Sequence, residues 1–330
     1  MMKILSLNTH SLAEPDCGRK LEQFAAVVAR ELPDIIGLQE VNQTALAPAL
    51  WPEEPEGFTV CRGMDGWNGE KKKDRNGDAA ESFLRRDHYG AQLSKCLKKL
   101  GLSYDWTWIP VKLGYGKYDE GLALFSRYPI LDTHQCLISR SREYQNWKTR
   151  KLLGILTQIP GRQPAWFYTV HMGWWDDEEE PFQEQWDRLQ DALAERLEPG
   201  KPPVWLMGDF NSRDDVRGQG YDYVKSRGWK DTYVLAEKKD SGKTVEAAID
   251  GWKERKDAGG REDGEGSIPG MRIDYIWCSQ EEKIRESKVI CNGREYPVVS
   301  DHSGVLVTAK DPEPASAEKM SKNPSGEQKK

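Results

Sequence analysis

The sequence predicts a protein of the α/β class, and three features support this prediction. Residues 2–7 form a short apolar run typical of a strand, and apolar side chains recur at helical spacing over residues 19–32. Residues 34–38 form a second buried-strand pattern, and patterns of both kinds alternate to about residue 309 with no linker between them. Strands and helices in this order predict one α/β domain, to which we assign residues 1–310.

Further helices and strands continue this alternation. A helix is expected over 87–100, where apolar side chains share one face, and another over 181–197, where Pro181 suits the first turn. Apolar runs predict the remaining strands at 120–126, 151–159, 165–170, 203–207, 272–278 and 303–308.

Three polar segments lie outside this alternation. Residues 64–81 and 253–267 are polar and rich in glycine and charge, which predicts two long loops. Residues 311–330 consist mainly of Pro, Ser, Lys and Glu and have almost nothing to bury, so we expect a disordered C-terminal tail.

The composition narrows the class of protein. Of the 330 residues, 48 are Lys or Arg and 54 are Asp or Glu, and the net charge of -6 disfavours a non-specific nucleic-acid binder. The six cysteines include no C-x-x-C pair, which favours a reducing compartment. No apolar run is long enough for a signal peptide or a membrane span. We therefore expect a cytoplasmic protein with no membrane partner.

Polar side chains recur where the apolar runs end or begin. They are Asn8, Glu40, His171, Asp209, Asn211, Asp274, Asp301 and His302. Residues at one edge of an α/β sheet converge on a crevice, so these groups can share one site. Turn formation or helix capping explains a single Asp or Asn. Capping does not explain two histidines, or a carboxylate directly after the apolar IIGLQ and another inside RIDYIW. We infer one common site.

The residue types at this site indicate metal-dependent phosphoester hydrolysis. Glu40, Asp301 and Asn8 are hard oxygen donors with no cysteine among them, which suits Mg²⁺ or Mn²⁺ better than zinc. Two histidines can move a proton or hold a phosphoryl oxygen while the metal stabilises the growing charge. Asp274 is the candidate that orients His302 through its other ring nitrogen.

Sequence blocks carry a resemblance to a known family. LSLNTH, GLQEVNQ, EGLALFSRYPI, YTVHMGWW, MGDFNSR, RIDYIW and VSDHSGV, taken in order between residues 3 and 308, resemble the exonuclease III, DNase I and inositol-phosphatase-like hydrolases, the endonuclease/exonuclease/phosphatase superfamily. The resemblance implies a four-layer α/β sandwich, in which two packed mixed β-sheets are flanked by helices. It also implies a divalent-metal-dependent, in-line attack of water on phosphorus.

The resemblance also implies roles for particular residues. Asn8, Glu40 and Asp301 look like the metal site, and Asp209 with Asn211 looks like the pair that positions the attacking water and a phosphate oxygen. His171 occupies the position of a phosphate-binding residue, and Asp274 with His302 looks like the family's Asp-His pair. Either Asp209 or His302 is the general base, and the sequence leaves this choice open.

The segments between these blocks bear on the substrate. DWTWIPVKLGYGKYDEGLALFSRYPI, QNWKTRKLLG and VHMGWWDDEEEPFQEQW resemble the maltose 6'-phosphate phosphatase branch, which implies hydrolysis of a sugar phosphate to sugar and phosphate. Lys148 and Arg150 are candidates for contact with the phosphate, with surface solvation as the alternative. Trp174 and Trp175 are candidates for contact with the sugar, although most of the 13 tryptophans are expected to be packing residues.

Other functions stay open at this stage. A metal-dependent nuclease on the same fold is the main alternative, and only under that alternative is nucleic acid a partner. A catalytically silent phosphosugar-binding module is a third possibility, although every expected catalytic position is filled. A sphingomyelinase ranks lower because the chain shows no apolar membrane-binding segment.

Overall fold

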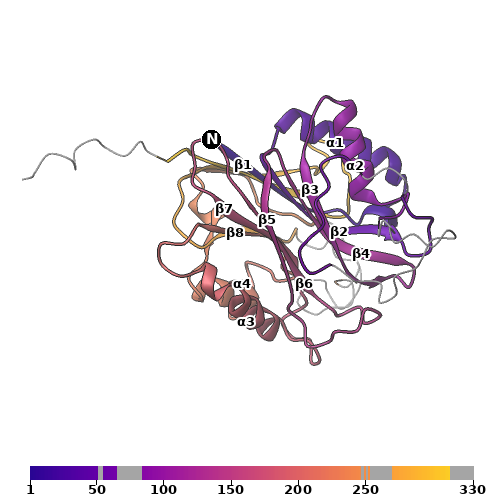
Figure 1. Ribbon diagram of the computed structural model, residues 1–330. Helices are drawn as coiled ribbons and strands as arrows, with labels where there is room; N and C mark the ends of the chain where they lie inside the picture. The colour runs from indigo at the N-terminus through magenta and orange to yellow at the C-terminus, as the bar shows by residue number, and fades with distance from the viewer. Residues whose placement is uncertain (51–54, 65–83, 247–248, 250–251, 253–269, 313–330) are drawn as a thin grey trace, which may run out of the picture.

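Two β-sheets packed against each other form the centre of the molecule (Figure 1). The structure is a computed structural model that describes residues 1–50, 55–64, 84–246, 249, 252 and 270–312. The predicted loops at 64–81 and 253–267 and the predicted tail at 311–330 lie outside these residues, apart from positions 64, 311 and 312.

The first sheet, called sheet 1, has seven strands and mixed direction. β1 pairs with β2 in parallel and with β13 in antiparallel orientation. The strands in spatial order are β10 (Lys238–Lys239), β12 (Ile284–Ile290), β13 (Gly304–Ala309), β1 (Met2–Asn8), β2 (Ile35–Thr44), β4 (Tyr118–Ser126) and β3 (Asp105–Gly114).

The second sheet, called sheet 2, has six strands and is also mixed. β7 and β8 pair in parallel, and the pairs on either side of them are antiparallel. Its strands in spatial order are β5 (Ile130–Leu137), β6 (Lys151–Thr157), β7 (Ala165–His171), β8 (Val204–Asp209), β11 (Asp274–Cys278) and β9 (Lys230–Asp231).

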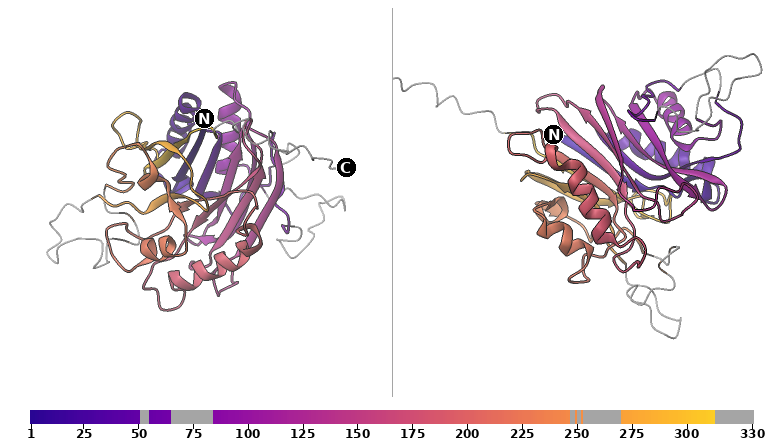
Figure 2. Two further views of the ribbon diagram at one scale, coloured as in Figure 1. Left: turned by 90° about the vertical axis from the view of Figure 1, so that its left-hand side faces the viewer. Right: turned by 60° about the horizontal axis from the view of Figure 1, so that its bottom comes forward.

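Helices cover the outer face of each sheet (Figures 1 and 2). The helices α1 (Cys17–Glu31) and α2 (Tyr89–Lys99) pack on sheet 1, where Phe24 and Leu93 join a core cluster with strand residues such as Leu38. On sheet 2, α3 (Phe182–Leu193) and α4 (Gly220–Ser226) cover the opposite side of the molecule. The arrangement is the four-layer sandwich that the resemblance implied.

The inner faces of the two sheets are in close contact. Ile4 and Ile35 of sheet 1 share a core cluster with Phe167 and Trp205 of sheet 2. Gly37 in β2 shows how near the sheets lie, because a Cβ atom built there would be 2.5 Å from the Sδ of Met207 in β8. A larger residue at this position would have to displace the methionine side chain, so glycine allows β2 and β8 to approach closely.

The predicted helices and strands are present, with some differences at their ends. The third helix ends at Leu193, four residues earlier than expected, and continues as a 3₁₀ turn over Ala194–Arg196. The strand expected at 34–38 is longer and runs to Thr44. Three of the longer strands, β3, β5 and β12, are absent from the sequence prediction, and in β3 Pro110 interrupts the strand pattern. β3 lies at the edge of sheet 1, where a residue without an N–H is tolerated.

Strand register brings the predicted polar residues into one region. His171 at the end of β7 pairs with Asp209 at the end of β8, and Asp209 pairs with Asp274 at the start of β11. Asn8 ends β1 in the facing sheet. The site therefore lies where strand ends of both sheets meet. Among the described residues, every helix is too short or too polar to cross a membrane.

Candidate active site

A cavity of about 360 Å³ lies at this meeting of strand ends. Most of the predicted site residues line it, namely Glu40, Arg150, His171, Trp174, Asp209, Asn211, Asp301 and His302. A larger cavity of about 620 Å³ lies beside Arg196 and Trp229, at the opposite end of sheet 2, and its described lining contains none of the predicted residues. The smaller cavity is therefore the candidate active site.

Asp209, His302 and Asp274 form a buried row in which the histidine lies between the two carboxylates. The Nδ1 of His302 is 3.0 Å from Asp274 Oδ2, and its Nε2 is 3.7 Å from Asp209 Oδ2. Burial lowers the pKa of His302, but the two carboxylates outweigh it and raise the pKa to about 10. Burial raises the pKa of Asp209, and the positive charge of His302 partly offsets that effect. His302 is therefore a cation at neutral pH.

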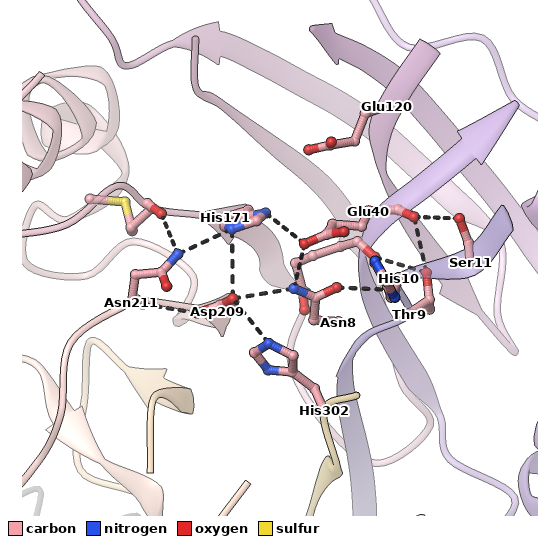
Figure 3. A network of polar contacts seen from close by, with 12 residues as sticks. Asn8, Thr9, His10, Ser11, Glu40, Glu120, His171, Asp209, Asn211 and His302 are labelled. Carbon is pink, nitrogen blue, oxygen red and sulfur yellow. Dashed lines mark hydrogen bonds and ion pairs between the residues drawn. The ribbon is translucent and has the colours of Figure 1, made fainter. Parts of the chain in front are cut away.

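Asn8 connects the two sheets at the site (Figure 3). Its Nδ2 donates to Glu40 Oε1 at 2.9 Å and to Asp209 Oδ2 at 3.2 Å. Its Oδ1 accepts from the backbone N–H of His10 at 3.2 Å. The amide nitrogen, and not the oxygen that a cation requires, thus faces the two carboxylates. A half-turn of the amide exchanges these atoms.

A β-bulge directs Glu40 into the site. The pairing of β2 with β4 shifts register between Leu38 and Val41, and Glu40 within this interval has a φ of 53°. The hydroxyls of Thr9 and Ser11 donate to the Glu40 carbonyl, at 3.1 Å and 2.6 Å. These bonds hold a left-handed backbone that disfavours side chains, which is typical of a functional position.

Asn211 is a second left-handed residue, with a φ of 45°, and it holds His171. Its Nδ2 donates to the carbonyl of Met172 at 3.0 Å and lies 3.1 Å from His171 Nε2. Its Oδ1 accepts from the indole N–H of Trp252 at 3.0 Å. Its own backbone N–H donates to Asp209 Oδ1 at 2.8 Å, so one residue orients both the histidine and the carboxylate.

His171 is a neutral imidazole. Burial lowers its pKa well below the ordinary value, and the charges of Arg150 and Lys112 lower it further. Because Nε2 accepts from Asn211, the proton lies on Nδ1. This Nδ1 is buried, has no hydrogen-bond partner and is 3.8 Å from Glu40 Oε1. It is a free donor beside the cavity.

The ligand chemistry around Glu40 suits a divalent cation. Burial raises the pKa of Glu40, and the nearby carboxylates of Glu120 and Asp301 raise it further. A bound cation would offset this concentration of negative charge. In the described part of the chain, two groups of three potential ligands lie close together: His10, Glu14 and Asp301, and Asp209, Asp274 and His302. Neither group includes Glu40. The ligand atoms within each group lie within 4.8 Å of one another.

His10 and Glu14 lie beside Asp301 at the candidate site, although the predicted site residues did not include them. His10 Nδ1 is 2.8 Å from Glu14 Oε1, and its Nε2 is 3.0 Å from the hydroxyl of Tyr115. Burial lowers the pKa of His10, but Glu14, Asp301 and Glu40 raise it to about 9. His10 follows two residues after Asn8 in LSLNTH, so its position was a usable signal. Glu14 precedes α1 in a segment without any pattern.

The structure brings only part of the predicted substrate-binding set to the cavity. Arg150 and Trp174 line it, and the Trp174 ring lies 5.6 Å from that of Trp147 at an angle of 58°. Lys148 instead pairs with Asp177 at 2.9 Å and Glu179 at 3.2 Å.

Trp175 also lies outside the described lining. Its ring packs against Phe182 at 6.1 Å and Tyr223 at 5.8 Å, so it covers the start of α3. The acidic residues before α3 neutralise Lys148, and the apolar start of α3 binds Trp175. Neither residue is retained in the binding set.

Comparison with known proteins places this geometry in a family. The profile of the Endonuclease/Exonuclease/phosphatase family matches residues 5–302. No curated protein was found that matches the chain. A solved endonuclease/exonuclease/phosphatase family protein from Leptotrichia buccalis is 27% identical, with a TM-score of 0.73, and the match covers 94% of this chain and 100% of that one.

Two other solved structures share the fold at lower identity. A functionally unknown conserved protein from Enterococcus faecalis is 14% identical with a TM-score of 0.60, and covers 94% of this chain and 100% of its own. The mannosyl-6-phosphatase Bt3783 from Bacteroides thetaiotaomicron is 18% identical with a TM-score of 0.59 and the same coverage. The protein therefore belongs to the Endonuclease/Exonuclease/phosphatase family, whose members are phosphoric ester hydrolases that are typically dependent on a divalent metal.

Proposed function

We propose that this chain is a metal-dependent phosphomonoesterase that hydrolyses a sugar phosphate, maltose 6'-phosphate, to maltose and inorganic phosphate in the cytoplasm. The observation that carries the proposal is the position of Arg150. This arginine is 3% exposed and lines the same cavity as Asp209 and His302, with no carboxylate partner among the described residues. The carboxylates of Glu120, Asp209 and Glu40 act on this guanidinium only through space. A buried guanidinium without an ion-paired carboxylate favours binding of a phosphate group beside the proposed catalytic residues.

The roles of the cavity residues follow from their charges. Asp209 is the base that takes a proton from water, because His302 is already protonated and lies next to it. Asp274 holds His302 in place and keeps it charged. His302, His171 Nδ1 and Arg150 then donate to the oxygens of the phosphoryl group. Water attacks phosphorus in line with the sugar oxygen, and the bond from phosphorus to that oxygen breaks. The departing sugar oxygen takes a proton from solvent, and Asp209 returns to solvent the proton that it took from the water.

Glu40, Asp301 and Asn8 are the residues we propose to hold Mg²⁺ or Mn²⁺. The oxygen-rich donor set and the buried negative charge at Glu40 support a hard cation over zinc. Asn8 contributes its Oδ1 after the half-turn of its amide. When bound, the metal supplies Lewis-acid stabilisation of the charge that grows on the phosphoryl oxygens.

Two tryptophans at the cavity support a sugar as the leaving group. Trp147 and Trp174 both line it, and Trp147 is 50% exposed. An exposed indole beside a polar cavity offers apolar area for the CH face of a sugar ring. The fold also occurs in a protein named mannosyl-6-phosphatase, although the 18% identity shows a common fold alone.

The family includes nucleases as well as phosphatases, so nucleic-acid phosphodiesters are the second candidate substrate. A substrate panel separates the two. Phosphate release from maltose 6'-phosphate, glucose 6-phosphate and trehalose 6-phosphate, and cleavage of single-stranded and duplex DNA, should be measured with and without EDTA. We expect phosphate release from maltose 6'-phosphate that EDTA abolishes. Both forms of DNA should stay intact. Cleaved DNA with inert sugar phosphates would replace the proposal by the nuclease alternative.

A further inference from the structure

Arg150 differs from Arg272, another buried arginine of the described chain, in having an open binding face. Arg272 is 4% exposed, and its guanidinium is paired with Asp214 at 3.0 Å and with Asp231 at 2.8 Å. Arg150 is equally buried, yet its Nη1 donates only to the carbonyl of Trp147 at 3.3 Å, and its Nε has no hydrogen-bond partner. Leaving such a charge unpaired is costly unless an anion completes it.

Hydrogen bonds hold the backbone of Arg150 in place. Its N–H donates to Ser139 Oγ at 3.0 Å, and its carbonyl accepts from the backbone N–H of Ile138 at 3.0 Å. The residue directly precedes β6, whose strand pairing anchors one side. The guanidinium is therefore presented to the cavity from a rigid base.

A second buried cation, Lys112, lines the same cavity. Lys112 in β3 and Glu120 in β4 are direct cross-strand partners, each 6% exposed, and Lys112 Nζ is 3.0 Å from Glu120 Oε1. Gly114 makes room for this pair, because a Cβ atom built there would be 2.5 Å from Glu120 Oε2. An ammonium has three N–H donors, and one ion pair leaves donors for a ligand.

Lys112 and Arg150 line the same cavity, so both can contact a ligand bound there. Burial lowers the pKa of Lys112, and the charge of Arg150 lowers it further, while Glu120 opposes both effects. Both cations also lower the pKa of His171. An anion bound between them would relieve the repulsion between the two positive charges.

Phosphate monoesters and diesters differ in charge and in the number of terminal oxygens, and both properties affect binding to a pair of cations. A monoester carries a charge of about -1.5 to -2 at neutral pH and has three terminal oxygens. A diester carries a single negative charge, and its third oxygen is bonded to a second carbon group. His302, His171 and Arg150 already serve the two terminal oxygens that both classes present. A further buried cation therefore adds more binding energy for the monoester, which has a third terminal oxygen and the larger negative charge.

We propose that Lys112, held by Glu120 and acting beside Arg150, is the residue that makes this cavity selective for the terminal phosphate of a monoester over a diester. This inference rests on the proposed function, since it concerns the substrate class of the same site. Arg150 binds a phosphate oxygen of either substrate. Lys112 binds the third oxygen, which only the monoester presents.

The direct test is Lys112→Met assayed with p-nitrophenyl phosphate and bis(p-nitrophenyl) phosphate in the presence of Mg²⁺. The ratio of kcat/KM for the monoester to that for the diester should fall about 10- to 100-fold, as expected for the loss of a hydrogen bond to a charged group. The inhibition constant of inorganic phosphate should rise by a similar factor. An unchanged ratio, or equal losses on both substrates, would overturn the inference.

Two further variants separate recognition from structural effects. Lys151→Met is the matched control, because Lys151 is outside the described cavity lining. Its Nζ donates at 3.0 Å to the carbonyl of Pro110, which lies on β3 like Lys112. This control should keep the wild-type ratio. If Lys112 merely neutralised Glu120, the double variant Lys112→Met with Glu120→Gln would restore the monoester preference, and that result would also overturn the inference. We expect the preference to stay low.

The same assay distinguishes failure of this inference from failure of the proposed function. A wild-type protein that cleaves the diester and leaves the monoester intact overturns both. A wild-type protein that hydrolyses the monoester, combined with an unchanged ratio in Lys112→Met, leaves the phosphatase proposal standing and removes only the role of Lys112.

Discussion

The Nδ1 of His302 lies 3.0 Å from the Oδ2 of Asp274, and both side chains are buried. Two carboxylates flank this imidazole, so it stays charged although burial opposes a charge. The contact leaves Nε2 directed at Asp209. In the proposed mechanism these three titratable groups have separate roles: Asp209 accepts a proton, His302 provides positive charge and Asp274 orients His302.

Replacement of the base tests this arrangement. Asp209→Asn keeps the shape of the side chain and removes its capacity to take a proton, so kcat should fall by about 10²- to 10⁴-fold in a folded protein. Asp187→Asn is the control, since Asp187 lies on α3, where it accepts from the Tyr223 hydroxyl at 2.7 Å. A near-normal rate for Asp209→Asn, measured by phosphate release, would remove Asp209 from catalysis.

Glu40→Gln tests the proposed metal site. The substitution removes one negative charge from several ligands, so the Mg²⁺ concentration for half-maximal activity should rise and high Mg²⁺ should restore part of the rate. Titration of activity with Mg²⁺ checks this. Glu281→Gln, at an exposed position, should match the wild type. If the metal dependence of Glu40→Gln equals that of the wild type, Glu40 is not a ligand.

Trp147→Ala tests the proposed contact with the sugar. Loss of an aromatic contact worth about 0.5–1.5 kcal/mol should raise KM for maltose 6'-phosphate roughly 2- to 10-fold. KM for glycerol 3-phosphate, which has no sugar ring, should change little. The side chain is 50% exposed, so the fold should tolerate its removal. Equal changes in KM for the two substrates would argue against stacking on a sugar.

Stability should depend on pH through His88, which caps α2 by accepting from the backbone N–H of Ala91 at 3.1 Å. Burial lowers its pKa to about 3, from 6.5 when exposed. The unfolded chain therefore takes up the proton first as the pH falls. The contribution of neutral His88 to the free energy of unfolding is therefore complete above pH 6.5. It falls by about 1.4 kcal/mol per pH unit as the pH drops toward 3.

His88→Asn provides the comparison, because asparagine also caps helices and does not titrate. The free energy of unfolding, measured by urea denaturation across this pH range, should fall less steeply for the variant than for the wild type. Parallel slopes would show that His88 is not held neutral by the fold.

The close packing of the sheets predicts opposite effects for two glycine substitutions. Gly37→Ala places a methyl group against Met207 and should lower the free energy of unfolding by about 1–3 kcal/mol. At Gly18 in α1 nothing lies within 4 Å of the added Cβ, so Gly18→Ala should be neutral or stabilising by up to about 1 kcal/mol. Chemical denaturation of both variants checks the pair, and equal effects would contradict the tight contact at Gly37.

Sequence patterns predicted the fold because apolar runs ending in polar residues mark strands that stop at a shared edge. The register of β7, β8 and β11 then places His171, Asp209 and Asp274 side by side. Sequence periodicity alone cannot predict this register. β3 was missed because Pro110 is incompatible with an internal strand and only its edge position permits it.

Charge partners were harder to predict than site positions. The bulge that directs Glu40 depends on the pairing of β2 with β4. Lys148 lies only two residues before Arg150, but a neighbouring acidic segment pairs with the first and leaves the second facing the cavity. Such partners come from loops whose paths carry no periodic signal.

The most direct test of the account is the initial rate of inorganic phosphate release from maltose 6'-phosphate, measured with Mg²⁺ and again after addition of EDTA. We expect steady release with Mg²⁺, which EDTA abolishes and excess Mg²⁺ restores. Release that is indifferent to the chelator would contradict the metal-dependent mechanism. No release under either condition would contradict the assignment of maltose 6'-phosphate as the substrate.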